Sequence, residues 1–293
     1  MLPAACCALL SVHRNKAGIG PQLVIVGIGL TGEEKAAVDN FCQSHQLVIS
    51  VIDFHGVSKF PASQGRWQKS TLARLYLDEL ADPSLDRVLY LDADILALSR
   101  VDELLEIDLH GKAIGAVEDY ISAFPDKLAR RRSDLGLPSS ACYFNAGVIL
   151  MDMKAVRAGA FLATARELMW SGRTFENNDQ DILNIAFRGA WHPLNHRFNV
   201  QTGFMPYVKD PALLHFTGRR KPWQQSIRWL HEPFASMYLD MLRSTRWKCF
   251  VSKRGVLRRV SDVFLSIGAA LESLHRVGKI KGFLATGRRL PHE

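Results

Sequence analysis

Short apolar runs alternate along the first 242 residues with segments whose apolar positions recur at helical spacing. The apolar runs predict strands at Gln22–Leu30, Leu47–Phe54, Arg87–Asp92, Ala113–Val117 and Ala146–Met153. The helical patterns predict helices over Glu33–Ser44, Thr71–Leu80, Val101–Leu105, Lys154–Trp170 and Asp179–Phe187. This alternation is typical of an α/β fold with a mostly parallel sheet covered by helices on both faces. Residues Asp126–Ser140, which include three consecutive arginines, are predicted to form a loop.

A different pattern begins after residue 242. Apolar side chains recur at helical spacing from Val256 to Leu274, with arginines beside that stripe at Arg254, Arg258, Arg259 and Arg276. Residues 243–293 hold twelve Lys and Arg against three Asp and Glu, and the whole chain has a formal net charge of +8. We therefore expect a near-neutral body and a basic amphipathic helical tail over 243–293 that docks on an anionic membrane surface. The alternative is a helix packed on the body, and nucleic-acid binding is not expected because no base-stacking aromatic pattern accompanies the charge.

Composition narrows the class of protein. Hydrophobic residues make up 47% and charged residues 23% of the 293 residues, which excludes a disordered or fibrous chain and fits one or two domains. No uninterrupted apolar stretch reaches the roughly 18 residues of a spanning helix, and no basic residue precedes the first apolar run, so neither an integral membrane protein nor a secretory signal is expected. Five cysteines without metal-ligand spacing favour reduced thiols in the cytoplasm, with Cys6 and Cys7 as small core residues.

A glycine-rich turn follows the first predicted strand. Gly27–Gly32 matches G-x-G-x-x-G and Asp53 lies about twenty residues further on, which is the outline of a dinucleotide-binding turn. However, Glu33 and Glu34 would repel a pyrophosphate at the start of the next helix, and Thr31 with Glu34 forms a capping box. We therefore predict an ordinary strand–turn–helix, with a nucleotide-cofactor oxidoreductase as the alternative.

Two carboxylates end the predicted strand Arg87–Asp92. Asp92 and Asp94 flank Ala93 at the carboxyl end of this strand, where ligands collect in open α/β sheets. Paired carboxylates at such an edge suit Mg²⁺ or Mn²⁺ that also binds phosphate oxygens. The other interpretation is a solvated strand end with turn-forming aspartates.

A histidine and a group of cations follow a short predicted strand within Leu214–Trp223 (LHFTGRRKPW). His215 would complete a carboxylate-rich Mn²⁺ site, and Lys221 would neutralise a diphosphate leaving group. The alternative is a histidine at the edge of the core, followed by a solvated basic loop.

Four motifs occur in a fixed order, namely LYLDAD, CYFNAGVILMDM, NNDQDILN and HFTGRRKPW. In this order and at these separations they resemble glycosyltransferase family 8, the retaining enzymes that include bacterial lipopolysaccharide galactosyl- and glucosyltransferases and glycogenin. The resemblance covers Leu2 to Trp223 and implies a GT-A-type fold, with residues 1–242 as the transferase domain. It also implies a UDP-galactose or UDP-glucose donor, Mn²⁺ with Mg²⁺ as the alternative ion, and a glycan or lipid-linked glycan acceptor.

The resemblance further implies roles for matching residues. The implied metal ligands are Asp92, Asp94 and His215. The implied donor-binding residues are Arg74, Asp92, Ala93, Asn145, Ala146, Asp179, Gln180, Gly218 and Lys221. The implied catalytic residues near the anomeric carbon are Asn145, Asp179, Gln180 and Asp181.

The residue types at these positions favour one mechanism by which the configuration at the anomeric carbon is retained. A departing UDP needs its charge stabilised, and polar side chains tolerate an oxocarbenium-like centre. Because Gln180 is an amide, and so a poor nucleophile, where a retaining hydrolase would place a carboxylate, we predict front-face transfer in which the leaving phosphate helps to deprotonate the acceptor hydroxyl. Asp181 as a covalent nucleophile is the alternative.

The N-terminus departs from the family pattern. The family's domain opens with a strand ending in an Asp that holds uracil and ribose, whereas MLPAACCALLSV resembles the helix after that strand. We expect that this first family strand is missing because the start codon is assigned too late, and the alternative is an inactive, truncated, membrane-associated remnant. The expected enzyme is cytoplasmic and peripheral on the inner face of the cell membrane.

Overall fold

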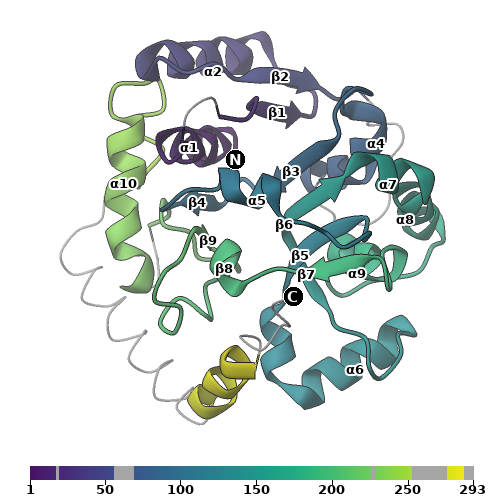
Figure 1. Ribbon diagram of the computed structural model, residues 1–293. Coiled ribbons are helices and arrows are strands. Elements are labelled where there is room, and N and C mark those ends of the chain that lie inside the picture. Colours follow the sequence, from purple (N-terminus) through teal and green to yellow (C-terminus); the bar gives the residue numbers. More distant parts are fainter. Residues whose placement is uncertain (18–19, 56–68, 226–228, 253–275, 287–293) are drawn as a thin grey trace.

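The computed structural model describes residues 1–17, 20–55, 69–225, 229–252 and 276–286 (Figure 1). The strands are β1 Val24–Gly27, β2 Ser50–Asp53, β3 Arg87–Leu91, β4 Ile95–Ala97, β5 Ile114–Glu118, β6 Phe144–Asp152, β7 Trp191–Pro193, β8 Val200–Gln201 and β9 Leu213–His215. The α-helices are α1 Leu2–Arg14, α2 Gly32–His45, α3 Lys69–Leu72, α4 Leu77–Leu80, α5 Asp102–Glu106, α6 Pro125–Leu135, α7 Met153–Ala158, α8 Phe161–Trp170, α9 Asn178–Ala186 and α10 Glu232–Leu242. The 3₁₀ helices are η2 Ala73–Tyr76, η3 Tyr120–Ala123, η4 His196–Phe198 and η5 Trp229–His231.

The strands lie in three sheets flanked by helices (Figure 1). One sheet has the order β3-β6-β5-β7, in which β6 is antiparallel to β3 and β5, and β7 is parallel to β5. β1 and β2 pair in parallel, and in the order β4-β9-β8 the strand β9 is antiparallel to β4 and parallel to β8. The α/β class is confirmed. The pairing is mixed rather than mostly parallel, because the long inner strand β6 runs against both of its neighbours.

Two predicted helices differ from the structure in detail. The helix predicted over Thr71–Leu80 is divided into α3, η2 and α4. The helix predicted over Lys154–Trp170 is divided into α7 and α8, because Ala160 adopts a left-handed conformation with φ of 50°. The remaining predicted elements lie within or around the observed ones.

The prediction of a loop over Asp126–Ser140 is wrong, because most of it is the helix α6. This helix begins at Pro125 and ends before Gly136, whose φ of 69° terminates it. Its buried residues are Leu128, Arg131 and Leu135, at helical spacing on one face. In the sequence, Arg131 interrupts the helical spacing of apolar residues in this segment. It is buried because it forms an ion pair with Asp181 on α9.

The hydrophobic core surrounds the helix α1, which packs against β4 and α10. Cys6 and Cys7 on α1 are fully buried, which confirms their prediction as core residues. A second cluster fills the space between the β5–β6 pair and the helices α8 and α9. The strand ends that carry polar side chains thus stand on a packed scaffold.

The predicted capping box at the start of α2 is confirmed. The Thr31 hydroxyl accepts a hydrogen bond from the Glu34 amide at 3.1 Å, and the Glu34 carboxylate accepts one from the Thr31 amide at 2.9 Å. Asp53 forms an ion pair with Lys35 at 2.7 Å. The glycine-rich turn and its acidic residue are therefore explained by local structure.

The basic tail is described only in part. Trp247, Phe250 and Val251, and further along Phe283 and Leu284 around the buried Ile280, pack against the first core cluster. The amphipathic stripe from Val256 to Leu274 lies outside the described residues. Among the described helices, none is long and apolar enough to cross a membrane.

Candidate active site

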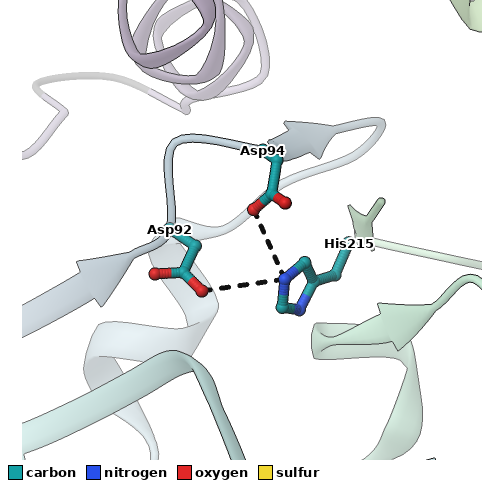
Figure 2. Close-up of side chains that lie close together, drawn as sticks. All are labelled: Asp92, Asp94 and His215. Atoms are coloured by element: carbon teal, nitrogen blue, oxygen red, sulfur yellow. Dashed lines mark ion pairs between the residues drawn. The ribbon is translucent and has the colours of Figure 1, made fainter. Parts of the chain in front are cut away.

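Two carboxylates and an imidazole converge where β3 gives way to β4 (Figure 2). The chain leaves β3 at Asp92, turns through Ala93 and Asp94, and enters β4, while the antiparallel strand β9 brings His215 opposite Ile95. His215 Nε2 lies 3.7 Å from an Asp92 oxygen and 3.4 Å from an Asp94 oxygen. The potential ligand atoms of all three lie within 4.8 Å of one another. The structure therefore brings the three predicted metal ligands together.

The orientation of His215 is set by a buried asparagine. His215 Nδ1 lies 3.0 Å from the Asn199 side-chain oxygen, and the Asn199 amide nitrogen donates to Asn145 Oδ1 at 2.9 Å. Because the oxygen of Asn199 can only accept, Nδ1 carries a proton, and Nε2 is the ring nitrogen directed at Asp92 and Asp94, where it would be the atom that binds a metal ion. Two carboxylates and a neutral imidazole form a donor set that suits Mn²⁺, so the residues present fit the implied ion.

A glycine on the central strand β6 leaves room for the ring of His215. A Cβ at Gly147 of β6 would lie 2.2 Å from His215 Cε1 and 2.6 Å from Nδ1. The backbone oxygen of Gly147 also accepts a hydrogen bond from the Asp92 amide at 2.8 Å. Gly147 therefore lies against two of the three proposed metal ligands, His215 and Asp92.

Lys221 lies on the other side of Asp94. Its ammonium donates to Asp94 Oδ2 and, at 2.5 Å, to the carbonyl oxygen of Phe216. Gly218, with φ of 86°, provides the left-handed turn of the loop between His215 and Lys221. Burial alone would raise the pKa of Asp94, but His215 and Lys221 lower it to below its usual value. Asp94 is therefore held as a carboxylate beside a compact cation.

Arg74 links this cluster to the helix α9. Its guanidinium donates to Asp92 Oδ1 at 2.7 Å and to the Ala146 carbonyl at 2.6 Å, and lies 3.0 Å from Asp179 Oδ2. It also stacks over the ring of Tyr90 at 4.5 Å. Burial opposes the charge of Arg74, but Asp179 and Asp92 raise its pKa, so it stays a cation. The buried guanidinium thus fixes both carboxylates relative to each other.

Gln180 is held by hydrogen bonds at both ends of its amide. Its oxygen accepts from Asn145 Nδ2 and the Ala146 amide, each at 3.1 Å. Its nitrogen donates to Asp119 Oδ2 and to the Tyr143 hydroxyl, each also at 3.1 Å. Every polar atom of the Gln180 side chain therefore has a partner, which fixes its position without a ligand.

These residues surround a cavity of about 520 Å³. Its lining includes the predicted donor-binding residues Arg74, Asp92, Asn145, Ala146, Asp179 and Gln180. Ala93, Asp94, His215, Gly218 and Lys221 do not line this cavity, although His215 lies 3.7 Å from the lining residue Asp92, and Asp94 lies 3.4 Å from His215. A volume of this size is in the range of small-molecule sites.

Asp181 points away from the cavity and is fully buried. Its two oxygens lie 3.2 and 2.9 Å from Arg131 Nη1, and one accepts from the Tyr143 hydroxyl at 2.6 Å and the other from the Asn177 amide at 2.8 Å. A carboxylate held in this way has no free lone pair directed at a sugar. The geometry therefore contradicts the alternative in which Asp181 attacks the donor, and Asp181 instead anchors Tyr143 beside Gln180.

Several residues of the site were not predicted. Asp119 follows β5 and accepts from both Asn145 at 2.9 Å and Gln180 at 3.1 Å. The strand-end rule that identified Asp92 and Asp94 applies equally to Asp119, so a signal for it existed. Tyr143 and Asn199 carried no comparable signal, because their roles depend on contacts between segments far apart in the chain.

Replacing Asn199 with alanine is expected to weaken Mn²⁺ binding roughly tenfold to a hundredfold, because His215 loses the partner that fixes its tautomer and orientation. Titration of the metal, followed by electron paramagnetic resonance, measures this effect without requiring turnover. The matched control is Asn195→Ala, which removes the side-chain cap of η4 and should leave Mn²⁺ affinity unchanged. Equal affinity in Asn199→Ala and the control would contradict the role of Asn199.

Comparisons with known protein sequences give a family match and several related enzymes. A family model described as glycosyl transferase family 8 matches residues 2–226. Lipopolysaccharide 1,2-glucosyltransferase of Escherichia coli (strain K12) is 29% identical over 196 residues, which are 62% of this chain and 56% of the relative. Lipopolysaccharide 1,3-galactosyltransferase of Salmonella typhimurium is 26% identical over 215 residues, 69% of this chain and 62% of the relative. The chain thus spans less than two thirds of the length of either relative.

A solved structure matches over more of its length. The galactosyltransferase LgtC, in complex with donor and acceptor sugar analogues, superposes with a TM-score of 0.72 at 25% identity, covering 85% of this chain and 96% of that one. The α/β fold is therefore shared with that galactosyltransferase.

Proposed function

The chain belongs to glycosyl transferase family 8, and from that membership we propose that it transfers galactose or glucose from a UDP-sugar to a glycan acceptor with retention of configuration. The observation that carries the proposal is the convergence of Asp92, Asp94 and His215 beside the cavity lined by Gln180. The lipopolysaccharide enzymes among the relatives support an acceptor of the lipopolysaccharide-core type.

We assign the leaving group to the end of the site that holds the three proposed metal ligands. Mn²⁺ bound by Asp92, Asp94 and His215, with Mg²⁺ as the alternative ion, would supply charge stabilisation for the departing diphosphate. Lys221 lies next to Asp94, so its ammonium is placed to neutralise a phosphate oxygen as well. Gly218 gives the backbone between His215 and Lys221 the turn that presents this cation.

The hexose is assigned to the end of the cavity lined by Asn145, Asp179 and Gln180. The bond between C1 of the sugar and the phosphate oxygen breaks, and a bond from the acceptor oxygen to C1 forms on the same face. The acceptor proton passes to the departing phosphate, which leaves as UDP. Hydrogen bonds to Asp119 and Tyr143 fix the position of the Gln180 amide. Its dipole can therefore stabilise the charge that develops at C1.

The position of Asp181 supports front-face transfer over a covalent intermediate. Its carboxylate is engaged by Arg131, Tyr143 and Asn177, and Asp179 is engaged by Arg74. A displacement from the opposite face of the sugar would need a free carboxylate, and neither of these two is free.

A screen of UDP-sugars tests the proposed function directly. Purified protein is incubated with UDP-galactose, UDP-glucose and UDP-glucuronate, with Mn²⁺ and with chelator, and UDP release is measured. We expect Mn²⁺-dependent release from UDP-galactose or UDP-glucose. Absence of release from both hexose donors, together with absence of UDP binding, would refute the proposal.

The alternative of an inactive relative is not favoured. Burying an arginine between two carboxylates costs desolvation free energy, and replacing all three groups with apolar residues would remove that cost. In an inactive copy we would therefore expect these three groups to be lost. Arg74, Asp92 and Asp179 are nevertheless in contact.

We further propose that residues 243–293 hold the enzyme at an anionic membrane surface. Replacing Arg254, Arg258 and Arg259 together with glutamine is expected to weaken binding to phosphatidylglycerol vesicles about a hundredfold, since each surface cation contributes about 1 kcal/mol. Sedimentation with the vesicles measures the effect at several salt concentrations.

The control for this prediction changes the same number of arginines on the body, at Arg100, Arg173 and Arg188. If that variant loses as much binding as the tail variant, the attraction belongs to the whole molecule and the proposed role of the tail is wrong.

A further inference from the structure

Tyr143 is a fully buried tyrosine that directly precedes β6 and does not line the donor cavity. Its hydroxyl oxygen lies 2.6 Å from Asp181 Oδ1, 3.1 Å from Gln180 Nε2 and 3.3 Å from Asn177 Nδ2. A phenol hydroxyl has one proton to donate. The chemistry of these neighbours therefore decides in which direction the hydroxyl donates.

The proton of Tyr143 is donated to Asp181. The carboxylate of Asp181 can only accept, and it also accepts from Arg131 at 2.9 Å and from the Asn177 amide at 2.8 Å. Burial and the nearby charge of Asp181 raise the pKa of Tyr143 well above its usual value, so the hydroxyl keeps this proton. The Tyr143 oxygen is left as an acceptor, which means that the Gln180 atom facing it must be the amide nitrogen.

Two further groups set the same orientation of the Gln180 amide. The backbone amide of Ala146 can only donate, and it lies 3.1 Å from Gln180 Oε1. The carboxylate of Asp119 can only accept, and its Oδ2 lies 3.1 Å from Gln180 Nε2. A flipped amide would place its oxygen against Asp119 and its nitrogen against the Ala146 amide, so it would lose these hydrogen bonds. One orientation of the side chain therefore satisfies every neighbour.

The hydrogen bonds continue from Gln180 to the proposed metal ligands. Asn145 Nδ2 donates to Gln180 Oε1 at 3.1 Å, and Asn145 Oδ1 accepts from Asn199 Nδ2 at 2.9 Å. Asn199 Oδ1 in turn lies 3.0 Å from His215 Nδ1, which donates to it. Each side chain donates to the next, so the hydrogen bonds run in one direction from His215 to Asp181. Tyr143 is the last link before the buried carboxylate.

We propose that Tyr143 is a positioning residue for the transfer step, in which its hydroxyl holds the Gln180 amide in the orientation that stabilises the charge at C1 of the donor sugar. The effect on transfer rests on the proposed function, whereas the orientation of Gln180 rests on the hydrogen bonds alone. Because Tyr143 does not line the cavity, it acts through Gln180 and not by contact with the donor. Its hydroxyl should therefore contribute to kcat and not to donor affinity.

Tyr143→Phe tests the proposal by removing only the hydroxyl. We expect kcat for UDP release from a UDP-hexose to fall about tenfold, the size of one lost hydrogen bond. KM for the UDP-hexose and the affinity for Mn²⁺ should stay within about twofold of the wild-type values. The matched control is Tyr238→Phe, since Tyr238 is equally buried and its hydroxyl has no hydrogen-bond partner among the described residues. That control should leave kcat unchanged.

A double-mutant cycle separates positioning from a structural role. If Tyr143 acts through Gln180, its hydroxyl should contribute nothing to kcat once the amide has been removed. Tyr143→Phe should therefore change kcat of the Gln180→Ala variant by less than about twofold, against about tenfold in the wild-type background. An equal loss of kcat in both backgrounds would overturn the proposal.

NMR of the Gln180 side-chain amide provides a readout that needs no turnover. The chain is labelled with ¹⁵N-glutamine, and the Gln180 signal is identified by its absence in Gln180→Ala. In the wild type we expect two separate amide-proton signals that exchange slowly with water, because both protons are hydrogen-bonded. Tyr143→Phe should shift one of them, and Tyr238→Phe neither. Wild-type signals at the positions typical of exposed glutamines would overturn the proposal, even if Tyr143→Phe failed to fold.

The outcomes distinguish this proposal from the proposed function. UDP release from a UDP-hexose that Tyr143→Phe leaves unchanged, or a Gln180 signal that it does not move, would overturn the positioning role alone. A Gln180 signal that moves in Tyr143→Phe, in a protein that neither binds UDP nor releases it from UDP-hexoses, would overturn the proposed function. Tyr143 would then still orient Gln180, but for a different reaction.

Discussion

Replacing Asp94 with alanine is expected to lower Mn²⁺-dependent release of UDP about a thousandfold and to leave the chain folded. Asp94 is the carboxylate that contacts both His215 Nε2 and the Lys221 ammonium, so its loss affects the proposed metal site and the adjacent cation together. Several kcal/mol of transition-state stabilisation come from such charges, and about 4 kcal/mol corresponds to a thousandfold in rate. Rates of UDP release and Mn²⁺ titrations measure the two effects.

The fold should survive this change because the surrounding groups keep other partners. Lys221 retains the carbonyl of Phe216, and His215 retains Asn199. Asp108→Ala is the matched control, since Asp108 is an exposed carboxylate remote from the site. An Asp94→Ala variant with the native Tm and undiminished turnover would remove Asp94 from the mechanism.

The proposed metal ligands could be predicted from the sequence for a physical reason. Asp92 and Asp94 are one residue apart at a strand end, and His215 ends a short strand of its own, so each lies in a recognisable local context. Their convergence depends on the pairing of β4 with β9, which places His215 opposite Ile95. That pairing joins segments about 120 residues apart, and only the family resemblance implied it.

The residues that orient these groups could not be predicted in the same way. Asn199 lies in a stretch without regular periodicity, and its importance comes from hydrogen bonds to His215 and Asn145. Tyr143 precedes β6 as one aromatic residue among many, and only the fold places its hydroxyl between Asp181 and Gln180. Sequence patterns identify residues whose role depends on their own strand or helix. They do not identify residues whose role depends on contacts between segments far apart in the chain.

The errors in the fold have the same origin. The direction of β6 relative to β3 and β5 is not recorded in its apolar pattern, because parallel and antiparallel strands can both be fully buried. The helix α6 was missed because Arg131 occupies a core-facing position, where its charge is compensated by Asp181 on α9. A buried ion pair between distant elements therefore concealed a helical period.

Replacing Gly147 with alanine is expected to lower UDP release about a hundredfold and to weaken Mn²⁺ binding, although the substituted residue is not itself a ligand. The new Cβ would lie 2.2 Å from His215 Cε1, whereas ordinary contacts begin at 3.4 Å, so the ring must shift by about 1 Å, and a displacement of that size in an active site costs about a hundredfold in rate. Asn199 holds Nδ1 of the ring at 3.0 Å, so a rotation that relieves the clash would break this hydrogen bond. Overpacking should also lower the free energy of unfolding by about 1–3 kcal/mol.

The control for Gly147→Ala is Gly115→Ala on the neighbouring strand β5. There the new Cβ would meet the methyl groups of Leu109 at 2.7 Å and of Leu194 at 3.1 Å, which are the ends of flexible side chains and not parts of the donor site. Both variants should therefore lose some stability, and only Gly147→Ala should lose Mn²⁺ affinity and donor hydrolysis beyond that loss. If the two variants keep the same affinity and rate, the close approach of β6 to His215 does not position the imidazole, and the histidine must be held by Asn199 alone.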